Sequence, residues 1–163
     1  MKGLSELVLL MPPPNGHEPE RFDWSRIEED LGVQLPTDYK RFLELYGMEE
    51  IDNVIYPFHP TTQNPLINLK NQIVENLWAL RELRDGGEHV PFPIFPEPRG
   101  VVPWSRTANG DVCYWLTDEP DPDNWIVVIN EGRAPEWEES PLFRTPDGRR
   151  MATELARHVA PVP

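Results

Sequence analysis

The sequence predicts an α+β fold in which helices pack against a central antiparallel sheet of roughly four to six strands. Three patterns carry this prediction. Apolar residues recur at helical spacing within residues 24–47, and they do so again within residues 68–84. Apolar runs on either side of Asn109-Gly110 are typical of an antiparallel hairpin.

A chain of 163 residues can bury the core of one domain, so we expect residues 1–163 to form a single unit. Residues 1–21 are predicted to form an amphipathic N-terminal helix and a proline linker, and residues 22–158 to form the core. The first helix would dock through one apolar face, which carries Leu4, Leu7, Val8 and Met11. A C-terminal helix is expected from the spacing of Met151, Leu155 and Val159.

Two short helices joined by a rigid corner are expected within residues 24–47. Trp24, Ile27 and Leu31 fall at helical spacing. Gly32 follows at the position where a residue in the left-handed conformation ends many helices.

The second helix of this pair is expected to begin at Pro36, because proline suits the first turn of a helix. Thr37 or Asp38 can cap its free amides, and Gly47 ends it. An i, i+3, i+4, i+7 stripe runs along it and predicts a face that packs inward on the sheet: Tyr39, Phe42, Leu43 and Tyr46.

These segments resemble the SUKH superfamily, which is named partly for a fungal cell-wall-synthesis regulator and is found largely as bacterial immunity proteins. The resemblance covers roughly residues 22–158. The residues that carry it are Trp24 with Ile27, Leu31-Gly32, Leu35-Pro36-Thr37-Asp38-Tyr39, Phe42-Leu43 and Tyr46-Gly47. It implies an α+β scaffold and no catalytic motif. Because one fold serves many functions, it constrains the fold more firmly than the function.

The middle of the chain predicts a short strand within residues 51–58 and then a long helix over residues 68–84. Gly86-Gly87 would end this helix, and Trp78 lies off its apolar stripe. One side of the helix carries Leu69, Ile73, Leu77, Leu80 and Arg84. Four prolines within residues 89–98 confine any strand there to a sheet edge.

Asn109-Gly110 predicts a type I′ turn, in which both central residues have positive φ. That register would place Trp104 opposite Trp115, and Arg106 opposite Cys113. The apolar runs 112–116 and 125–129 lack polar alternation, which indicates strands covered on both faces. A short edge strand is expected around Trp137.

The charge balance limits the partners of this chain. It carries 28 acidic and 15 basic residues, a formal net charge of −13. Nucleic acids and anionic membranes require a basic surface, so neither is an expected partner. A basic protein partner is compatible with this charge. The single cysteine, Cys113, excludes an internal disulfide and fits a cytoplasmic protein.

The sequence offers no catalytic, cofactor or metal site. The four histidines are scattered, and no pair has the spacing of metal ligands: His17, His59, His89 and His158. Cys113 lies within an apolar run, which favours a buried core residue over a nucleophile. Carboxylate pairs such as Glu136 with Glu138 are expected by chance among so many acids.

Acidic residues concentrate in segment 118–139, which contains eight acidic residues and a single basic residue, Arg133. Residues 118–124 join two predicted strands and carry two prolines, so we expect an extended loop that projects from one end of the sheet. A solvated loop that discourages edge pairing is the alternative interpretation. The candidate partner-binding residues are Asp118, Glu119, Asp121, Asp123, Glu136, Trp137 as an apolar anchor, Glu138 and Glu139.

Three functions of different classes follow. The resemblance and the acidic segment favour an immunity protein that masks a cognate toxin with a basic surface, and nucleases are one candidate class of toxin. A regulatory or scaffold protein of the same fold, binding a cellular protein, is the second hypothesis. An enzyme with an unrecognised carboxylate site is the third, and the sequence carries no nucleophile–base–orienter set for it.

Overall fold

The computed structural model describes residues 8–9, 12–48, 55–132 and 136–139 of the chain. Within these ranges the helices are α2 (Trp24–Leu31), α3 (Thr37–Tyr46) and α4 (Leu69–Asp85), with a short 3-10 helix, η1 (Pro122–Asn124). The strands are β1 (Ile55–Pro57), β2 (Val101–Thr107), β3 (Val112–Leu116), β4 (Ile126–Asn130) and β5 (Trp137–Glu139).

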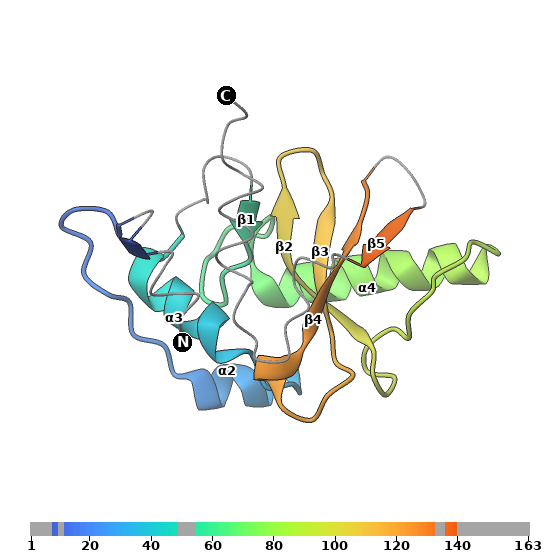
Figure 1. The fold of residues 1–163 in the computed structure, drawn as a ribbon, viewed down its shortest axis with the longest axis horizontal. Coiled ribbons are helices and arrows are strands. Elements are labelled where there is room, and N and C mark those ends of the chain that lie inside the picture. Colours follow the sequence, from blue (N-terminus) through green and yellow to red (C-terminus); the bar gives the residue numbers. More distant parts are fainter. Residues whose placement is uncertain (1–7, 10–11, 49–54, 133–135, 140–163) are drawn as a thin grey trace.

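The described strands form one antiparallel sheet whose spatial order follows the sequence, from β1 to β5 (Figure 1). This confirms the α+β class, and five strands lie within the expected number. Val8 packs against the core. The remaining positions of the predicted first helix, and the predicted helix at Met151, Leu155 and Val159, lie outside the described residues.

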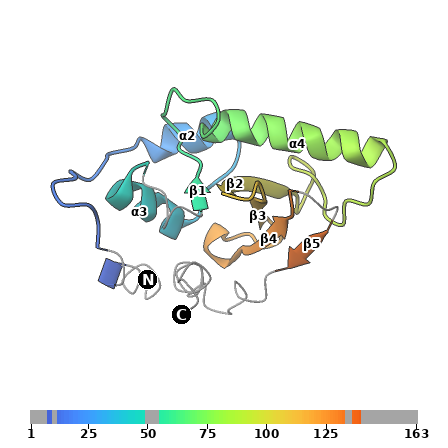
Figure 2. The same ribbon diagram turned by 90° about the horizontal axis from the view of Figure 1, so that it is seen from above.

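Helices α3 and α4 cover opposite faces of the sheet. Along β3, Trp115 contacts Tyr39 of α3, with ring centroids 5.0 Å apart. Arg106, which pairs with Val112 on the alternate face, donates to the Gln72 side chain of α4 at 2.9 Å. Successive strand residues point to opposite faces. All five residues of β3 are buried, which confirms the prediction of a central strand. Figure 2 shows α4 alongside β2 on one side of the sheet.

The predicted helix pair is confirmed, and polar contacts stiffen its corner. Gly32 ends α2 at φ +72°, in the left-handed region where glycine carries no Cβ penalty. Across the corner, Glu28 accepts from the Leu35 N–H at 2.8 Å and pairs with Lys40. The Trp24 indole N–H donates to Glu44 at 2.9 Å, which joins the two helices.

The predicted stripe of α3 is buried: Tyr39, Phe42, Leu43 and Tyr46. Helix α4 also follows its pattern, since Leu69, Ile73, Leu77 and Leu80 are buried and the helix ends before Gly87. The fully buried Gln72 fixes the position of α4 on the sheet, because its side-chain oxygen accepts from Arg106 of β2 as well as from Asn76 of α4. A buried amide is tolerated when its hydrogen bonds are made.

The β2–β3 turn differs from the predicted one. The Gly110 N–H donates to the Thr107 carbonyl at 3.0 Å, and the Thr107 N–H donates to the Asp111 carbonyl at 2.9 Å. Gly110 has φ +92°, whereas Asn109 does not have positive φ. The loop is therefore a type I turn followed by a left-handed glycine, and the predicted type I′ turn is wrong.

The register of this hairpin changes accordingly. Arg106 pairs with Val112, so the predicted pair of Arg106 and Cys113 is wrong. A second irregularity at Trp104 leaves it without a direct partner, and Val102 pairs with Trp115 instead. The bulge still turns Trp104 onto Trp115: their rings stack with centroids 5.6 Å apart and planes at 11°.

The remaining strands match their predictions in part. The short edge strand at Trp137 is confirmed as β5. In β4, Val127 and Val128 are buried while Ile126 and Ile129 are half-buried, so this strand is less covered than predicted. Between residues 89 and 98 only a single bridge forms, from Ile94 to Val101, because proline removes ladder donors.

Substitutions at Gly110 and Asn109 distinguish the observed type I turn with its left-handed glycine from a type I′ turn. Gly110→Ala is expected to lower the free energy of unfolding by about 1–2 kcal/mol, because alanine is strained at this φ. No heavy atom lies within 4 Å of the position of the added Cβ, so the cost is conformational. Asn109→Ala, the matched control, is expected to cost less than about 0.5 kcal/mol. Urea denaturation measures both, and equal losses would restore the type I′ turn.

Candidate functional site

The acidic loop, defined as residues 118–124, is folded rather than extended. Pro122 opens η1, and Asp121 caps it by accepting from the Asp123 N–H at 3.0 Å. The Trp125 indole N–H closes the loop by donating to the Glu119 carbonyl at 2.7 Å. Proline at the first turn and aspartate at the cap favour this short helix. The prediction of an extended loop is therefore wrong.

Asp123 joins the acidic loop to α3. Its carboxylate accepts from the Thr37 N–H at 2.6 Å and from the Thr37 hydroxyl at 2.9 Å. The first amides of a helix have no partner within the helix, so this carboxylate supplies the missing acceptor. The N-cap residue Pro36 offers no side-chain acceptor. Of the two predicted caps, Thr37 is replaced by Asp123 from far along the chain, whereas Asp38 does accept from a first-turn amide, that of Tyr39.

Asp38 lies beside this contact and completes the acidic end of α3. Its Oδ1 accepts from the Tyr39 N–H at 2.8 Å. Burial raises the pKa of Asp38 from the ordinary 3.8 to about 6, and the nearby charge of Asp123 adds to the rise. The sequence pattern indicates Asp38 only as a cap, because its approach to Asp123 depends on how the chain folds.

The other carboxylates of the loop differ in their availability. Glu119 and Asp121 are exposed, and the Asp121 carboxylate is also used within the loop. Asp118 is half-buried, and its Oδ1 has no donor among the described residues. The acidic loop therefore presents Glu119 and Asp121 outward, while Asp123 is committed to the fold.

The second group of candidates lies on β5, at the far side of β4. Asn130 pairs with Trp137, whereas the acidic loop precedes Ile126 at the other end of that strand. The Glu136 carbonyl accepts from the Glu131 N–H at 3.2 Å, beyond this far end. A five-residue strand spans roughly 13 Å. Glu136 and the acidic loop therefore lie at opposite ends of the sheet, not on one acidic end. Glu138 and Glu139 pair in register with Ile129 and Val128.

Trp137 is not a free anchor. Its ring lies 5.4 Å from that of Phe92 and 5.4 Å from that of Tyr114, and its side chain is half-buried. The exposed tryptophan is Trp78 on α4, which is 60% exposed. Its position off the apolar stripe of α4 was the sequence signal for this exposure.

Chemical groups for catalysis are sparse in the part of the chain that the structure describes. Cys113 is buried, as predicted, and burial raises the pKa of its thiol to about 11, which disfavours the nucleophilic thiolate. Among the described residues, no group of three His, Cys, Asp or Glu side chains could hold a metal ion. No helix in the described ranges is long and apolar enough to cross a membrane.

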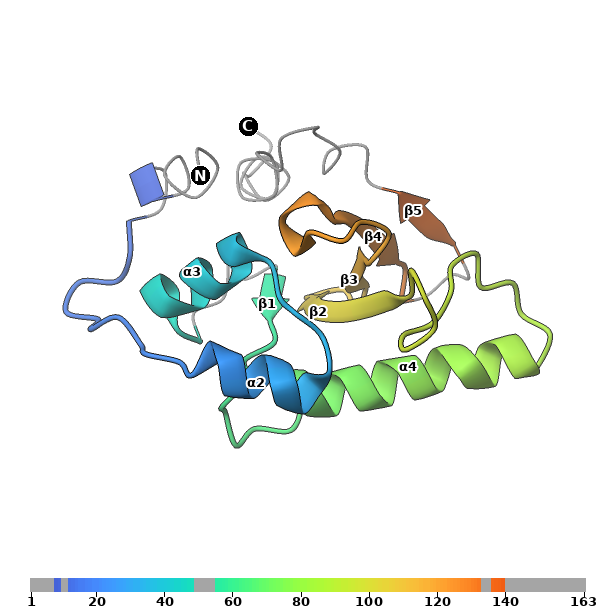
Figure 3. The ribbon, with the colours of Figure 1, turned by 90° about the horizontal axis from the view of Figure 1, so that it is seen from below.

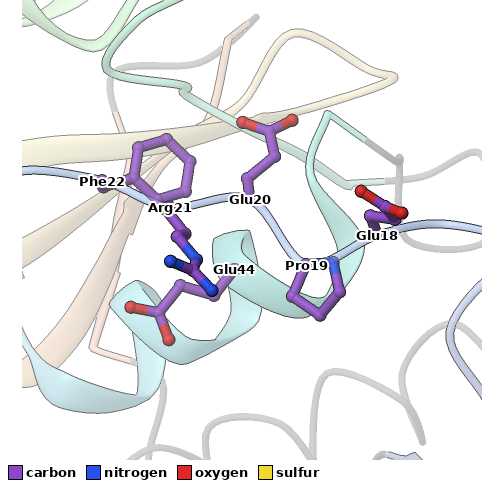
Figure 4. A pocket seen from close by; sticks show the side chains of 6 residues that line it. All are labelled: Glu18, Pro19, Glu20, Arg21, Phe22 and Glu44. Atoms are coloured by element: carbon purple, nitrogen blue, oxygen red, sulfur yellow. The ribbon is translucent and has the colours of Figure 1, made fainter.

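An open pocket of about 740 Å³ lies between the segment before α2 and helix α3 (Figure 4). It is lined by Glu18, Pro19, Glu20, Arg21, Phe22 and Glu44. Glu44 already accepts from Trp24, and Glu20 lies 3.2 Å from the buried ring of His59. In Figure 4 the Arg21 side chain points toward Glu44, while Glu20 points away from both. Glu20 and Glu44 thus serve contacts within the fold, and the lining holds no cysteine, serine, threonine, lysine or histidine.

A family model described as SUKH_6, SMI1-KNR4 cell-wall, matches residues 22–143. The chain belongs to this family. The match spans the helix pair, α4 and the whole described sheet, so the resemblance seen in residues 24–47 is confirmed. Proteins of this SUKH family are generally non-catalytic. No curated protein and no solved structure matches the chain.

Removing the Asp123 cap should destabilise this SUKH domain. Asp123→Ala is expected to lower the free energy of unfolding by about 1–2 kcal/mol, because the first amide of α3 loses its acceptor. Glu119→Ala is the control from the same loop, and we expect a change within about 0.5 kcal/mol because its side chain is exposed. Urea denaturation at pH 7 measures both. Equal effects would contradict a capping role for Asp123.

Asp38 should make stability depend on pH. Because folding raises the pKa of Asp38 to about 6, the folded state binds this proton more tightly than the unfolded state. The contribution of the protonated Asp38 carboxyl to the free energy of unfolding is complete below about pH 4 and is lost as the pH rises through about 6. In Asp38→Asn this loss is absent, so the unfolding free energy of the variant relative to wild type should rise by about 1–3 kcal/mol between pH 4 and pH 7.5.

Urea titrations of both proteins at four pH values measure this difference. Glu119→Gln, which neutralises an exposed carboxylate of the acidic loop, serves as the control and should follow wild type. A constant difference between Asp38→Asn and wild type across this range would remove Asp38 as the titrating group.

Proposed function

We propose that this SUKH protein is a cytoplasmic, non-catalytic immunity protein that neutralises a bacterial toxin by covering part of its surface. Family membership supports a protein-binding role. The observation that carries the proposal further is the contact of Asp123 with Thr37, which holds an acidic loop in one conformation. A binding surface that is ordered before association loses less conformational entropy when it binds.

The expected partner is a toxin with a basic surface. Nucleases are one such class, because a surface that binds phosphates must be basic. The outward carboxylates of Glu119 and Asp121 would draw such a surface by long-range attraction and speed the encounter. The net charge of −13 acts in the same direction.

The β5 candidates supply a second, separate part of the proposed surface. Glu136 is exposed at the far end of β4, whereas Trp137 is largely committed to Phe92 and Tyr114. A toxin that contacts both groups would have to span the β3–β4–β5 part of the sheet. We assign the acidic loop the larger role, because its carboxylates share one ordered segment.

A regulatory or scaffold role is the second candidate. It is favoured by the cell-wall description of the matching family model and would use the same scaffold without a toxin. Catalysis is the weakest candidate, because Cys113 is buried with a raised pKa and two of the three carboxylates that line the open pocket, those of Glu20 and Glu44, are engaged in contacts within the fold.

Co-expression tests the proposed function. The protein should restore growth to cells that produce the toxin encoded beside its gene, and the purified pair should form a complex. Failure of both, with a folded and expressed protein, would favour the regulatory role.

The contribution of the acidic loop is tested by kinetics. Glu119→Gln with Asp121→Asn should slow association with that toxin by about threefold to tenfold at low salt, because two steering charges are lost. Raising the ionic strength should shrink the difference, since salt screens exposed charges. Glu29→Gln, an exposed acid on α2, is the matched control. Equal association rates for all three proteins would exclude the acidic loop from the encounter surface.

A further inference from the structure

The outer face of α4 carries an apolar ridge that the fold does not use. Val74 is 62% exposed and Trp78 is 60% exposed, one helical turn apart. The stripe that faces the sheet is already complete without them, as Leu69, Ile73, Leu77 and Leu80 are buried. Figure 3 shows α4 along the outer edge of the molecule, and Figure 2 agrees. An exposed tryptophan one turn from an exposed valine leaves apolar area in water, which favours the use of this ridge as a contact surface.

The charges around this ridge are mainly acidic. Glu75, Glu82 and Asp85 fall on the same side of the helix as Trp78, at 100° per residue. Among the described residues none of these three acids forms an ion pair within 4.0 Å. Glu75 accepts from the Gln72 amide at 3.1 Å.

The bases of α4 are engaged in contacts of their own, and Arg81, which also lies about 60° from Trp78 around the helix, is half-buried. Lys70 pairs with Asp30 of α2 at 2.7 Å. Arg81 donates to the Phe95 carbonyl at 2.5 Å, and Arg84 pairs with Glu97 at 2.8 Å. The ridge therefore presents apolar side chains within a negative border.

We propose that this ridge, comprising Val74, Glu75, Trp78, Glu82 and Asp85, is a docking surface for a protein that offers an apolar groove bordered by lysine and arginine. Tryptophan is among the residues that most often dominate the energy of an interface. The acidic border selects a basic groove and disfavours others.

The acidic border favours a basic protein partner over two other occupants, a second copy of this chain and an anionic membrane. A second copy docked by twofold symmetry would set these acids against their own equivalents, which is repulsive. An anionic membrane would repel them as well. The ridge also lies across the sheet from the η1 segment, as Figures 2 and 3 show, so it is distinct from the acidic loop. The proposal does not rest on toxin neutralisation.

Site-specific photo-crosslinking tests the proposal. The photoreactive residue p-benzoylphenylalanine replaces Val74 in the full chain, expressed in its own host, and Leu83 in a control protein. Leu83 is 46% exposed and lies about 180° from Val74 around the same helix. We expect the photoreactive residue at position 74 to crosslink to one protein. The photoreactive residue at position 83 should not crosslink to that protein. The crosslinked protein is then identified and purified.

Affinity of the purified partner decides the role of the ridge. Trp78→Ala should weaken binding at least about 30-fold, whereas Leu83→Ala should change it less than threefold. Glu82→Gln with Asp85→Asn should reduce the salt dependence of the affinity. Circular dichroism should show wild-type folding for Trp78→Ala, since the side chain is exposed.

Three outcomes would overturn the docking surface. These are the absence of an adduct specific to position 74, an adduct with a second copy or with lipid, and equal losses of affinity for Trp78→Ala and Leu83→Ala. Failure of toxin neutralisation alongside a successful crosslink would overturn only the immunity role. A crosslink to the toxin itself would assign the ridge to that interface.

Discussion

Tyr39 is the point at which the helix pair and the sheet are joined, and the rest of the fold depends on it. Its ring meets Trp115 edge-on at 5.0 Å and lies 6.4 Å from Trp24 and 6.5 Å from Trp104. Its hydroxyl donates to the Phe58 carbonyl. Aromatic contacts of this kind add about 0.5–1.5 kcal/mol each beyond burial. Because the hydroxyl must also find its acceptor, one orientation of α3 on the sheet is selected.

That orientation determines what the acidic residues can do. With α3 seated on the sheet, its first turn meets the acidic loop, and Asp123 becomes the acceptor for Thr37. Asp38 is then enclosed beside a second carboxylate, which raises its pKa to about 6. Part of the negative charge of segment 118–139 therefore serves the fold. The carboxylates of Glu119 and Asp121 stay exposed, and they lie on a loop whose shape is already set.

The molecule thus has two unlike surfaces separated by the sheet. The acidic loop offers charge with little apolar area, which suits fast encounter with a basic protein. The α4 ridge offers Trp78 and Val74 within an acidic border, which suits a slowly dissociating contact. Helix α4 packs without Val74 and Trp78, and α3 uses only Asp123 of the acidic loop as a cap, so the side chains of Glu119 and Asp121 stay exposed.

The sequence by itself determined α2, α3, α4, the α+β class and the family, because these depend on local periodicity and on caps such as Gly32 and Gly47. Tertiary structure decided the register of the hairpin, since the bulge at Trp104 follows from packing and not from the turn dipeptide. It also decided the candidate site. Thr37 and Asp123 are 86 residues apart, and no local pattern reports such a contact. Charge counting located the acids, and only the packed chain showed which of them are free.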